Sequence, residues 1–182
     1  LPYQRPPLSK AYLSGEQEQE KLLLRAATFY EKQNIEVKTS TSVTEINPQN
    51  STIRIDDRED LSFEHLLIAT GSRVRKINVS GSELNNIHYL RTIEDVDQIR
   101  SGMAKDKKLV IVGGGYIGLE VAAIATQAGM RVRVLETEDR VLQRVTTPTM
   151  SNYYTRLHEK RGVRIHTKTR VIGFEGESSV KR

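Results

Sequence analysis

The sequence contains no cysteine, which excludes disulfide bonds, thiolate metal sites and a cysteine nucleophile within these residues. Tryptophan is also absent and aromatic residues make up only 5%, with no RNA-binding or zinc-finger pattern, so no nucleic-acid partner is expected. No apolar run approaches the roughly 18 residues of a transmembrane helix. The opening LPYQRPPLSK is not a signal peptide. We therefore expect a soluble, cytoplasmic protein that does not bind membranes.

The charge balance is basic, with a net charge of +5 over 182 residues, a length that fits one domain or two small ones. The basic residues are scattered, so we interpret the excess as that of one piece of a larger protein. Leu1 is not an initiator methionine, which supports the same expectation. The histidines lack the spacing of metal ligands, so no metal site is predicted from His65, His88, His158 and His166.

The most informative segment runs from residue 109 to residue 136, LVIVGGGYIGLEVAAIATQAGMRVRVLE. A β-branched apolar run meets a G-x-G-x-x-G turn (Gly113, Gly115 and Gly118), a helix-forming segment and a second apolar run that ends at Glu136. This is the pattern of a dinucleotide-binding βαβ unit. Gly113 allows the tight turn, Gly115 lets the backbone approach a pyrophosphate, and Gly118 lets helix and strand pack closely. We also place Ile117 of this turn in the cofactor site.

Glu136 indicates which nicotinamide dinucleotide is bound. A carboxylate at this position accepts hydrogen bonds from the ribose hydroxyls of NAD and repels the 2′-phosphate of NADP. Arginines precede Glu136 on the strand, but Glu138 and Asp139 follow it and outweigh the single Arg140. The sequence therefore predicts NADH as the coenzyme.

The rest of the chain suggests two parts. Residues 1–104 begin with a Pro-containing loop and a short helix from Leu8 to Leu13, followed by helical composition over 16–34 and by short apolar runs separated by turn formers. These runs predict a small antiparallel meander, with strands at 35–37, 43–46, 53–55 and 66–69. A capping box at Thr92 predicts a helix to about residue 103.

Residues 105–182 hold the βαβ unit. A helix from Pro148 to Lys160, stopped by Gly162, and strands at 163–166 and 170–174 are expected to follow it. A dinucleotide-binding sheet needs more strands than these, so we expect a truncated domain. Unpaired strand edges of this kind are prone to association, and a homo-oligomer that covers them is expected.

Three further segments carry a family resemblance. YQRPPLSK (3–10), LLIATG (66–71) and YLRT (89–92) precede GGGYIGLE in the chain. Together they resemble FAD-dependent ferredoxin reductases of the putidaredoxin reductase type, in the pyridine nucleotide-disulfide oxidoreductase superfamily. The resemblance implies an α/β fold, with an incomplete Rossmann-type NAD-binding domain at 105–182 and part of an FAD-binding domain, with the meander, at 1–104. It also implies the cofactors FAD and NADH, and a [2Fe–2S] ferredoxin as electron acceptor.

The resemblance assigns roles to individual residues. Lys10 would lie beside the flavin and pair with Glu120 near the nicotinamide, and Tyr116 would cover the flavin until the nicotinamide displaces it. Further cofactor contacts would come from Val43, the segment Ala69-Thr70-Gly71, Arg91, Thr137 and Arg144. From the residues alone, Lys10 could equally be a solvated side chain, Glu120 a carboxylate favoured by the helix dipole, and Tyr116 a core residue. Arg91 could pair only with Glu94 or Asp95.

Two departures from the family pattern matter. Relatives that reduce disulfides carry a cysteine pair just before the lysine, where this chain has RPPL (5–8), so dithiol chemistry is not expected. The family also begins with its own G-x-G-x-x-G motif for FAD, and this chain has only one such motif. Two alternatives therefore stay open: a non-catalytic NAD-binding module, and a related flavoprotein such as an NADH oxidase, a nitrite reductase subunit or an apoptosis-inducing-factor-like protein.

Overall fold

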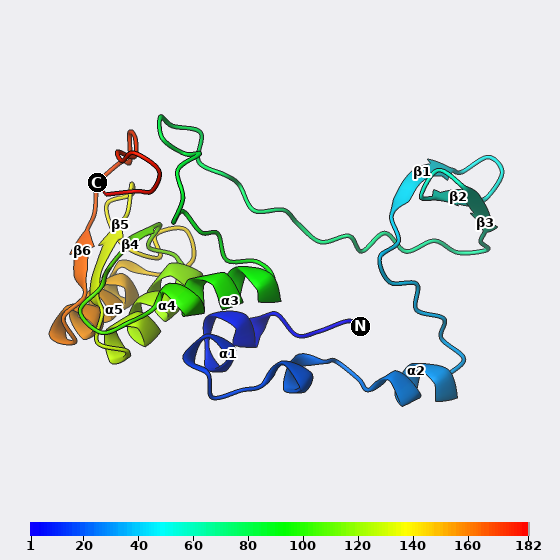
Figure 1. Ribbon diagram of the computed structural model, residues 1–182, viewed down its shortest axis with the longest axis horizontal. Helices are drawn as coiled ribbons and strands as arrows, with labels where there is room; N and C mark the ends of the chain where they lie inside the picture. The colour runs from blue at the N-terminus through cyan, green and yellow to red at the C-terminus, as the bar shows by residue number, and fades with distance from the viewer. Residues whose placement is uncertain (182) are drawn as a thin grey trace. The chain divides into compact units, whose positions relative to one another are not determined.

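The computed structural model describes residues 1–181 and divides into two compact units. The small unit consists of residues 1–3 and 23–73, and the large unit of residues 4–22 and 74 onward. Each unit contains one three-stranded sheet, antiparallel in the small unit and parallel in the large one (Figure 1). The α/β class and the meander predicted from the sequence are confirmed.

The small unit contains the meander. Its strands β1 (Val43–Asn47), β2 (Thr52–Ile55) and β3 (Glu59–Ser62) pair as sequential antiparallel neighbours. Ser51, Asp56 and Asp57 adopt positive φ angles in the connecting turns, a conformation that Asp tolerates better than most residues. On β2, Arg54 forms ion pairs with carboxylates of both neighbouring strands.

Parts of the sequence prediction for the small unit are wrong. The apolar runs at 35–37 and 66–69 do not form strands, whereas β3, which was not predicted, does. Leu67 and Ile68 remain 86% and 64% exposed. A strand is stabilised by a neighbouring strand, and no described residues pair with these two runs. The helical composition of 16–34 yields only a 3₁₀ turn, η2 (Gln19–Leu22), and the short helix α2 (Ala27–Lys32), because short helices need tertiary packing to persist.

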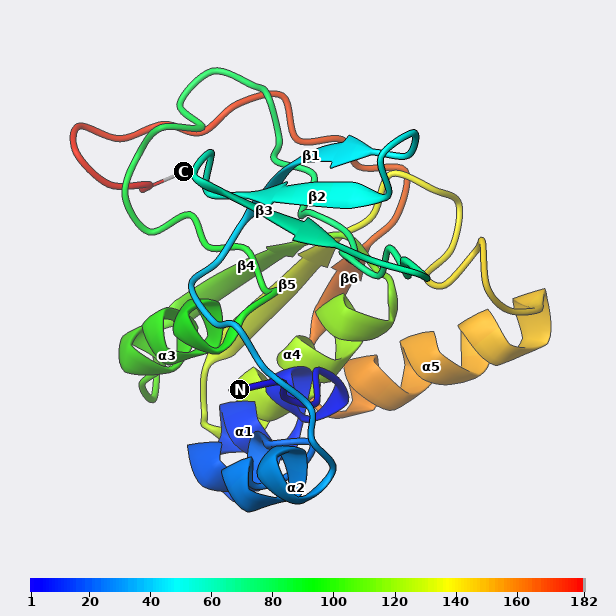
Figure 2. The ribbon, with the colours of Figure 1, turned by 90° about the vertical axis from the view of Figure 1, so that its right-hand side faces the viewer.

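The large unit is built on a parallel sheet in the order β4-β5-β6, formed by Lys108–Val112, Arg131–Leu135 and Arg164–His166. Helices α4 (Tyr116–Gln127) and α5 (Pro148–Lys160) cover one face of it (Figure 2). The core between them contains small residues of α4 against valines of β5, among them Ala122, Ala125, Val132 and Val134. The predicted strand–helix–strand unit is therefore confirmed.

Helix ends in the large unit follow local sequence signals. Helix α3 (Ile93–Gly102) begins with the predicted capping box: the Thr92 hydroxyl accepts from the Asp95 N–H, and the Asp95 carboxylate accepts from the Thr92 N–H. Helix α5 has the predicted bounds, with Thr147 as its cap. Gly162, at a φ of +92°, lies just beyond its end.

The N-terminal segment of the large unit packs on α3 and α4. The predicted helix at 8–13 is split into a 3₁₀ turn, η1 (Pro6–Ser9), and α1 (Ala11–Ser14), because Lys10 between them has non-helical backbone angles. Leu8 and Leu13 are each 1% exposed, which anchors both short elements. Lys10 is thereby held at a fixed kink in the chain.

The predicted strand at 170–174 is wrong: only an isolated bridge joins Gly173 to Ser80, and Ile172 is 84% exposed. No helix among residues 1–181 is long and apolar enough to cross a membrane.

Candidate functional site

The glycine turn joins β4 to α4 and has the geometry that its spacing predicts. Gly113 has a φ of +112°, which allows the chain to leave the strand in a tight turn. A Cβ atom on Gly118 would overlap the carbonyl oxygen of Gly113 and lie 3.3 Å from Ile111 Cγ2. Glycine at 118 is therefore what brings α4 against β4. Gly115 is the exposed N-cap of α4, so the free N–H groups of the helix face solvent.

Glu136, at the end of β5, is bonded to this turn. Its Oε2 atom accepts from the Gly114 N–H at 2.6 Å, and its Oε1 atom accepts from the Glu138 N–H at 2.9 Å and the Thr137 hydroxyl at 3.2 Å. Burial raises the pKa of Glu136, but these hydrogen bonds lower it by more, so the pKa lies below its usual value. The side chain is a fixed carboxylate beside the helix N-terminus.

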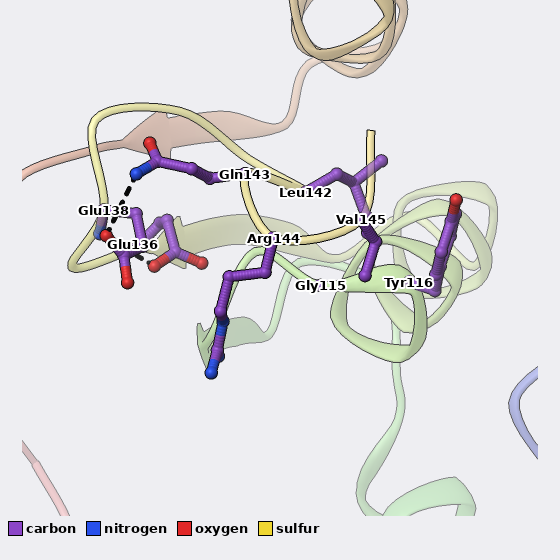
Figure 3. A pocket seen from close by; sticks show the side chains of 8 residues that line it. All are labelled: Gly115, Tyr116, Glu136, Glu138, Leu142, Gln143, Arg144 and Val145. Carbon is purple, nitrogen blue, oxygen red and sulfur yellow. Dashed lines mark hydrogen bonds between the residues drawn. The ribbon is translucent and has the colours of Figure 1, made fainter. Parts of the chain in front are cut away.

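A first hollow of about 310 Å³ opens at this point. Figure 3 shows the side chains around it, with Glu136 and Glu138 on one side, Tyr116 on the other and Arg144 between them. The full lining is Gly115, Tyr116, Glu136, Glu138, Leu142, Gln143, Arg144 and Val145. Thr137 is not part of the lining, but it contacts Glu136 directly. The predicted residues of the NAD site are thus gathered around one cavity.

The loop between β5 and α5 is held by a residue for which the sequence predicted no such role. The Arg140 guanidinium donates to the carbonyls of Thr146 and Gln143, at 2.9 and 3.0 Å, and to the Ser151 hydroxyl, at 2.6 Å. Ser151 is fully buried and donates in turn to the Val141 carbonyl. These bonds fix the loop that carries Arg144, and no local motif announces them.

A second hollow, of about 400 Å³, lies along the other side of Tyr116. It is lined by η1, α4 and the segment before α3, that is by Arg5, Pro6, Leu8, Ser9, Lys10, Leu90, Arg91, Tyr116, Ile117 and Glu120. Tyr116 lines both hollows and is 51% exposed, so it is not a core residue. The predicted pairing of Lys10 with Glu120 is confirmed, at 2.8 Å from Nζ to Oε1.

Arg91 contributes an unsatisfied donor to the second hollow. Its Nε atom is buried and has no hydrogen-bond partner among the described residues. Its backbone N–H donates to the Asp95 carboxylate, but its guanidinium forms no ion pair with Glu94 or Asp95 within residues 1–181. An unpaired buried donor costs about 1–3 kcal/mol, which a bound acceptor would recover. With Lys10, it makes this hollow suited to an anionic or electron-rich ligand such as a flavin nucleotide.

Four predicted cofactor residues belong to the small unit and line neither hollow of the large unit: Val43, Ala69, Thr70 and Gly71. Val43 is 53% exposed on β1, and Gly71 has a φ of +74°. Their roles remain predictions, as do the catalytic roles of Lys10, Tyr116 and Glu120.

Comparison with known proteins matches these features. The family model described as pyridine nucleotide-disulphide oxidoreductase matches residues 1–182. Putidaredoxin reductase of Pseudomonas putida is 46% identical over 178 residues, which cover 96% of this chain and 42% of that protein. A probable ferredoxin reductase of Castellaniella defragrans is 43% identical over 175 residues, which cover 96% of this chain and 43% of that protein.

A solved structure agrees with both. The covalent putidaredoxin reductase–putidaredoxin complex matches with a TM-score of 0.94 and 45% identity, over 99% of this chain and 45% of that one. The chain therefore spans less than half the length of the relatives that it matches. The resemblance to reductases of the putidaredoxin reductase type is confirmed, and the chain belongs to the pyridine nucleotide-disulphide oxidoreductase family.

Proposed function

We propose that this chain is part of an NADH-dependent flavoprotein that passes electrons from NADH through FAD to a [2Fe–2S] ferredoxin. The observation that carries the proposal is the position of Tyr116, which lines two hollows at once. One hollow holds the fixed carboxylate of Glu136, and the other holds the Lys10–Glu120 pair. Two ligands bound there would meet at Tyr116.

The first hollow suits NADH. Glu136 would accept from the ribose hydroxyls, the free N–H groups of α4 would bind the pyrophosphate, and Arg144 would pair with a phosphate. A 2′-phosphate would meet the carboxylates of Glu136 and Glu138, which disfavours NADPH. Thr137 supports this set through its bond to Glu136.

The second hollow suits the flavin ring. When bound, FAD supplies the redox chemistry: it accepts a hydride from NADH and releases electrons singly. Lys10 places a cation in this hollow, where it would stabilise negative charge on the reduced ring. Arg91 would donate through the Nε atom that now lacks a partner. Tyr116 would cover the ring and be displaced by the nicotinamide, which also requires Ile117 and the glycine turn to stay in place.

The remaining assignments extend the same proposal. Residues 1–104 would belong to an FAD-binding domain and 105–182 to an NAD-binding domain, with Val43 and the segment 69–71 reaching FAD. The ferredoxin acceptor is supported by the relatives, which are named as putidaredoxin and ferredoxin reductases. No cysteine precedes Lys10, so electrons would leave the flavin directly for the acceptor. A homo-oligomer and a cytoplasmic location also remain predictions.

The test uses the full-length protein to which this chain belongs. We expect a stoichiometric flavin absorbance that is bleached by NADH in the absence of oxygen and restored by an oxidised [2Fe–2S] ferredoxin. Lys10→Met should slow the bleaching at least tenfold, whereas Lys21→Met, an exposed lysine outside both hollows, should not. Saturable NADH binding without flavin would instead identify a non-catalytic NAD-binding module. Rapid reoxidation by oxygen but not by ferredoxin would identify an oxidase.

A further inference from the structure

Ser9 contacts the same carboxylate as Lys10. Its hydroxyl donates to Glu120 Oε2 at 2.5 Å, while the Lys10 ammonium lies 2.8 Å from Glu120 Oε1. Two consecutive residues therefore occupy the two oxygens of one carboxylate, which lies 111 positions further along the chain. We propose that Ser9 is a positioning residue that orients Glu120, and through it Lys10, in the flavin-facing hollow. This inference rests on the proposed function.

The hydrogen bond from Ser9 differs in kind from the ion pair beside it. The Lys10 side chain is 53% exposed, and an ion pair of this sort contributes little because a long, mobile side chain must be ordered in water. Ser9 is only 4% exposed and has one side-chain rotor to order. A hydroxyl that donates to a carboxylate forms a short, charge-assisted bond. Ser9 is thus the partner that fixes the carboxylate, and Lys10 adapts to it.

The backbone around Ser9 makes this contact rigid. Ser9 is the last residue of η1, and the Lys10 N–H that follows donates to the Pro7 carbonyl. Leu8 is almost fully buried, so the turn cannot shift without exposing its core contact. Glu120 lies on α4 one helical turn after Tyr116, which places it at the edge of the second hollow.

A fixed Glu120 in turn sets the position of the Lys10 ammonium. Lys10 Nζ has two acceptors among the described residues, Glu120 Oε1 at 2.8 Å and the Pro6 carbonyl at 3.3 Å. An ammonium carries three N–H donors, so one remains for a ligand in the hollow. Without Ser9, Glu120 Oε2 would lose its bond and the carboxylate could rotate away. The ammonium would then lose its fixed direction.

The experiment is a double-mutant cycle on Ser9 and Glu120 in the full-length, FAD-loaded protein. We expect Ser9→Ala to slow the single-turnover reduction of the flavin by NADH on the order of tenfold, to leave the apparent Kd for NADH unchanged, and to shift the flavin midpoint potential. In a Glu120→Gln background, Ser9→Ala should have no further effect, because the carboxylate that it orients is gone. Ser9→Thr, which keeps the hydroxyl, should restore most of the rate.

Two controls separate positioning from folding. Ser14→Ala removes an exposed hydroxyl of the same N-terminal segment that bonds only to the Ala11 carbonyl, and it should change none of these quantities. Equal losses from Ser9→Ala in both Glu120 backgrounds would show a merely structural role and overturn the inference. So would a normal rate and potential in Ser9→Ala.

A readout independent of turnover keeps the inference distinct from the proposed function. The rate at which an amine-selective acetylating ester modifies Lys10, followed by peptide mass spectrometry, reports how firmly the ammonium is held. Ser9→Ala should raise this rate severalfold, and should raise it no further once Glu120 is Gln. If the wild-type flavin is not reduced by NADH but Lys10 responds in this way, only the proposed function fails. If the wild type turns over and Lys10 does not respond, only the role of Ser9 fails.

Discussion

The carboxylate of Glu136 accepts a hydrogen bond of 2.6 Å from the backbone N–H of Gly114, which ties the end of β5 to the middle of the glycine turn. A Cβ atom on Gly114 would lie only 3.0 Å from Glu136 Oε2, so the contact also requires glycine at this position. The residue predicted to select the coenzyme therefore also shapes the turn that would bind its pyrophosphate.

Replacing Glu136 by Gln should weaken NADH binding. The variant loses a charged acceptor for the ribose and the charge-assisted bond to Gly114, each worth about 1.5–3 kcal/mol. We expect the Kd for NADH to rise about 10- to 100-fold by fluorescence titration, while discrimination against NADPH falls. Glu159→Gln, at an exposed position on α5, is the matched control and should bind NADH normally. Unchanged affinity in Glu136→Gln would contradict this placement of the ribose.

The same residue should affect stability in acid. The pKa of Glu136 lies below its ordinary value of 4.5. A carboxyl with a depressed folded-state pKa stabilises the fold above its unfolded pKa, and this contribution is lost as pH falls through the folded pKa. Below about pH 4.5, the wild type should therefore lose stability more steeply than Glu136→Gln. Urea unfolding between about pH 7 and pH 3 measures this, and parallel curves for the two proteins would contradict it.

Gly118→Ala should disrupt the junction of β4 and α4. The new Cβ would meet the Gly113 carbonyl, and overpacking of this kind costs about 1–3 kcal/mol. We expect a lower urea midpoint together with a loss of NADH affinity, since the turn must move. Gly102→Ala, the last residue of α3 with nothing within 4 Å of an added Cβ, should be neutral or slightly stabilising. Similar midpoints for the two variants would refute the packing argument.

Arg140→Met should loosen the loop that carries Arg144. It removes three hydrogen bonds and leaves two carbonyls and the buried Ser151 hydroxyl without their donor, at a cost of about 2–3 kcal/mol. Hydrogen exchange should rise at residues 140–147, and NADH affinity should fall with it. Arg156→Met, an exposed arginine on α5, provides the control. Unaltered exchange in the loop would show that other contacts hold it.

Sequence reasoning succeeded where structure is decided by neighbours in the chain. The glycine spacing fixed the turn between β4 and α4, the Thr92–Asp95 capping box began α3, and Pro148 and Gly162 bounded α5. These signals act through bonds and steric contacts within a few residues, so they hold without knowledge of the remaining fold. The βαβ period also determined which residues of β5 face α4.

It failed where the outcome depends on distant partners. The runs at 35–37, 66–69 and 170–174 have strand composition, but a ladder needs a neighbouring strand, and the described residues provide none. The hydroxyl of Ser9 was not singled out, because nothing near it in the chain indicates a carboxylate 111 residues away. The role of Arg140 in holding its loop was missed for the same reason.

The sequence by itself determined that a glycine turn, a helix and an acidic strand end would form one dinucleotide-binding unit, because those elements are specified by local backbone and packing preferences. It also suggested, through family resemblance alone, that Lys10 and Glu120 would pair. Only the tertiary structure placed Tyr116 between two hollows and joined Ser9 and Lys10 to the two oxygens of Glu120. The direction of a side chain across the fold depends on packing among η1, α3 and α4, which no local pattern encodes.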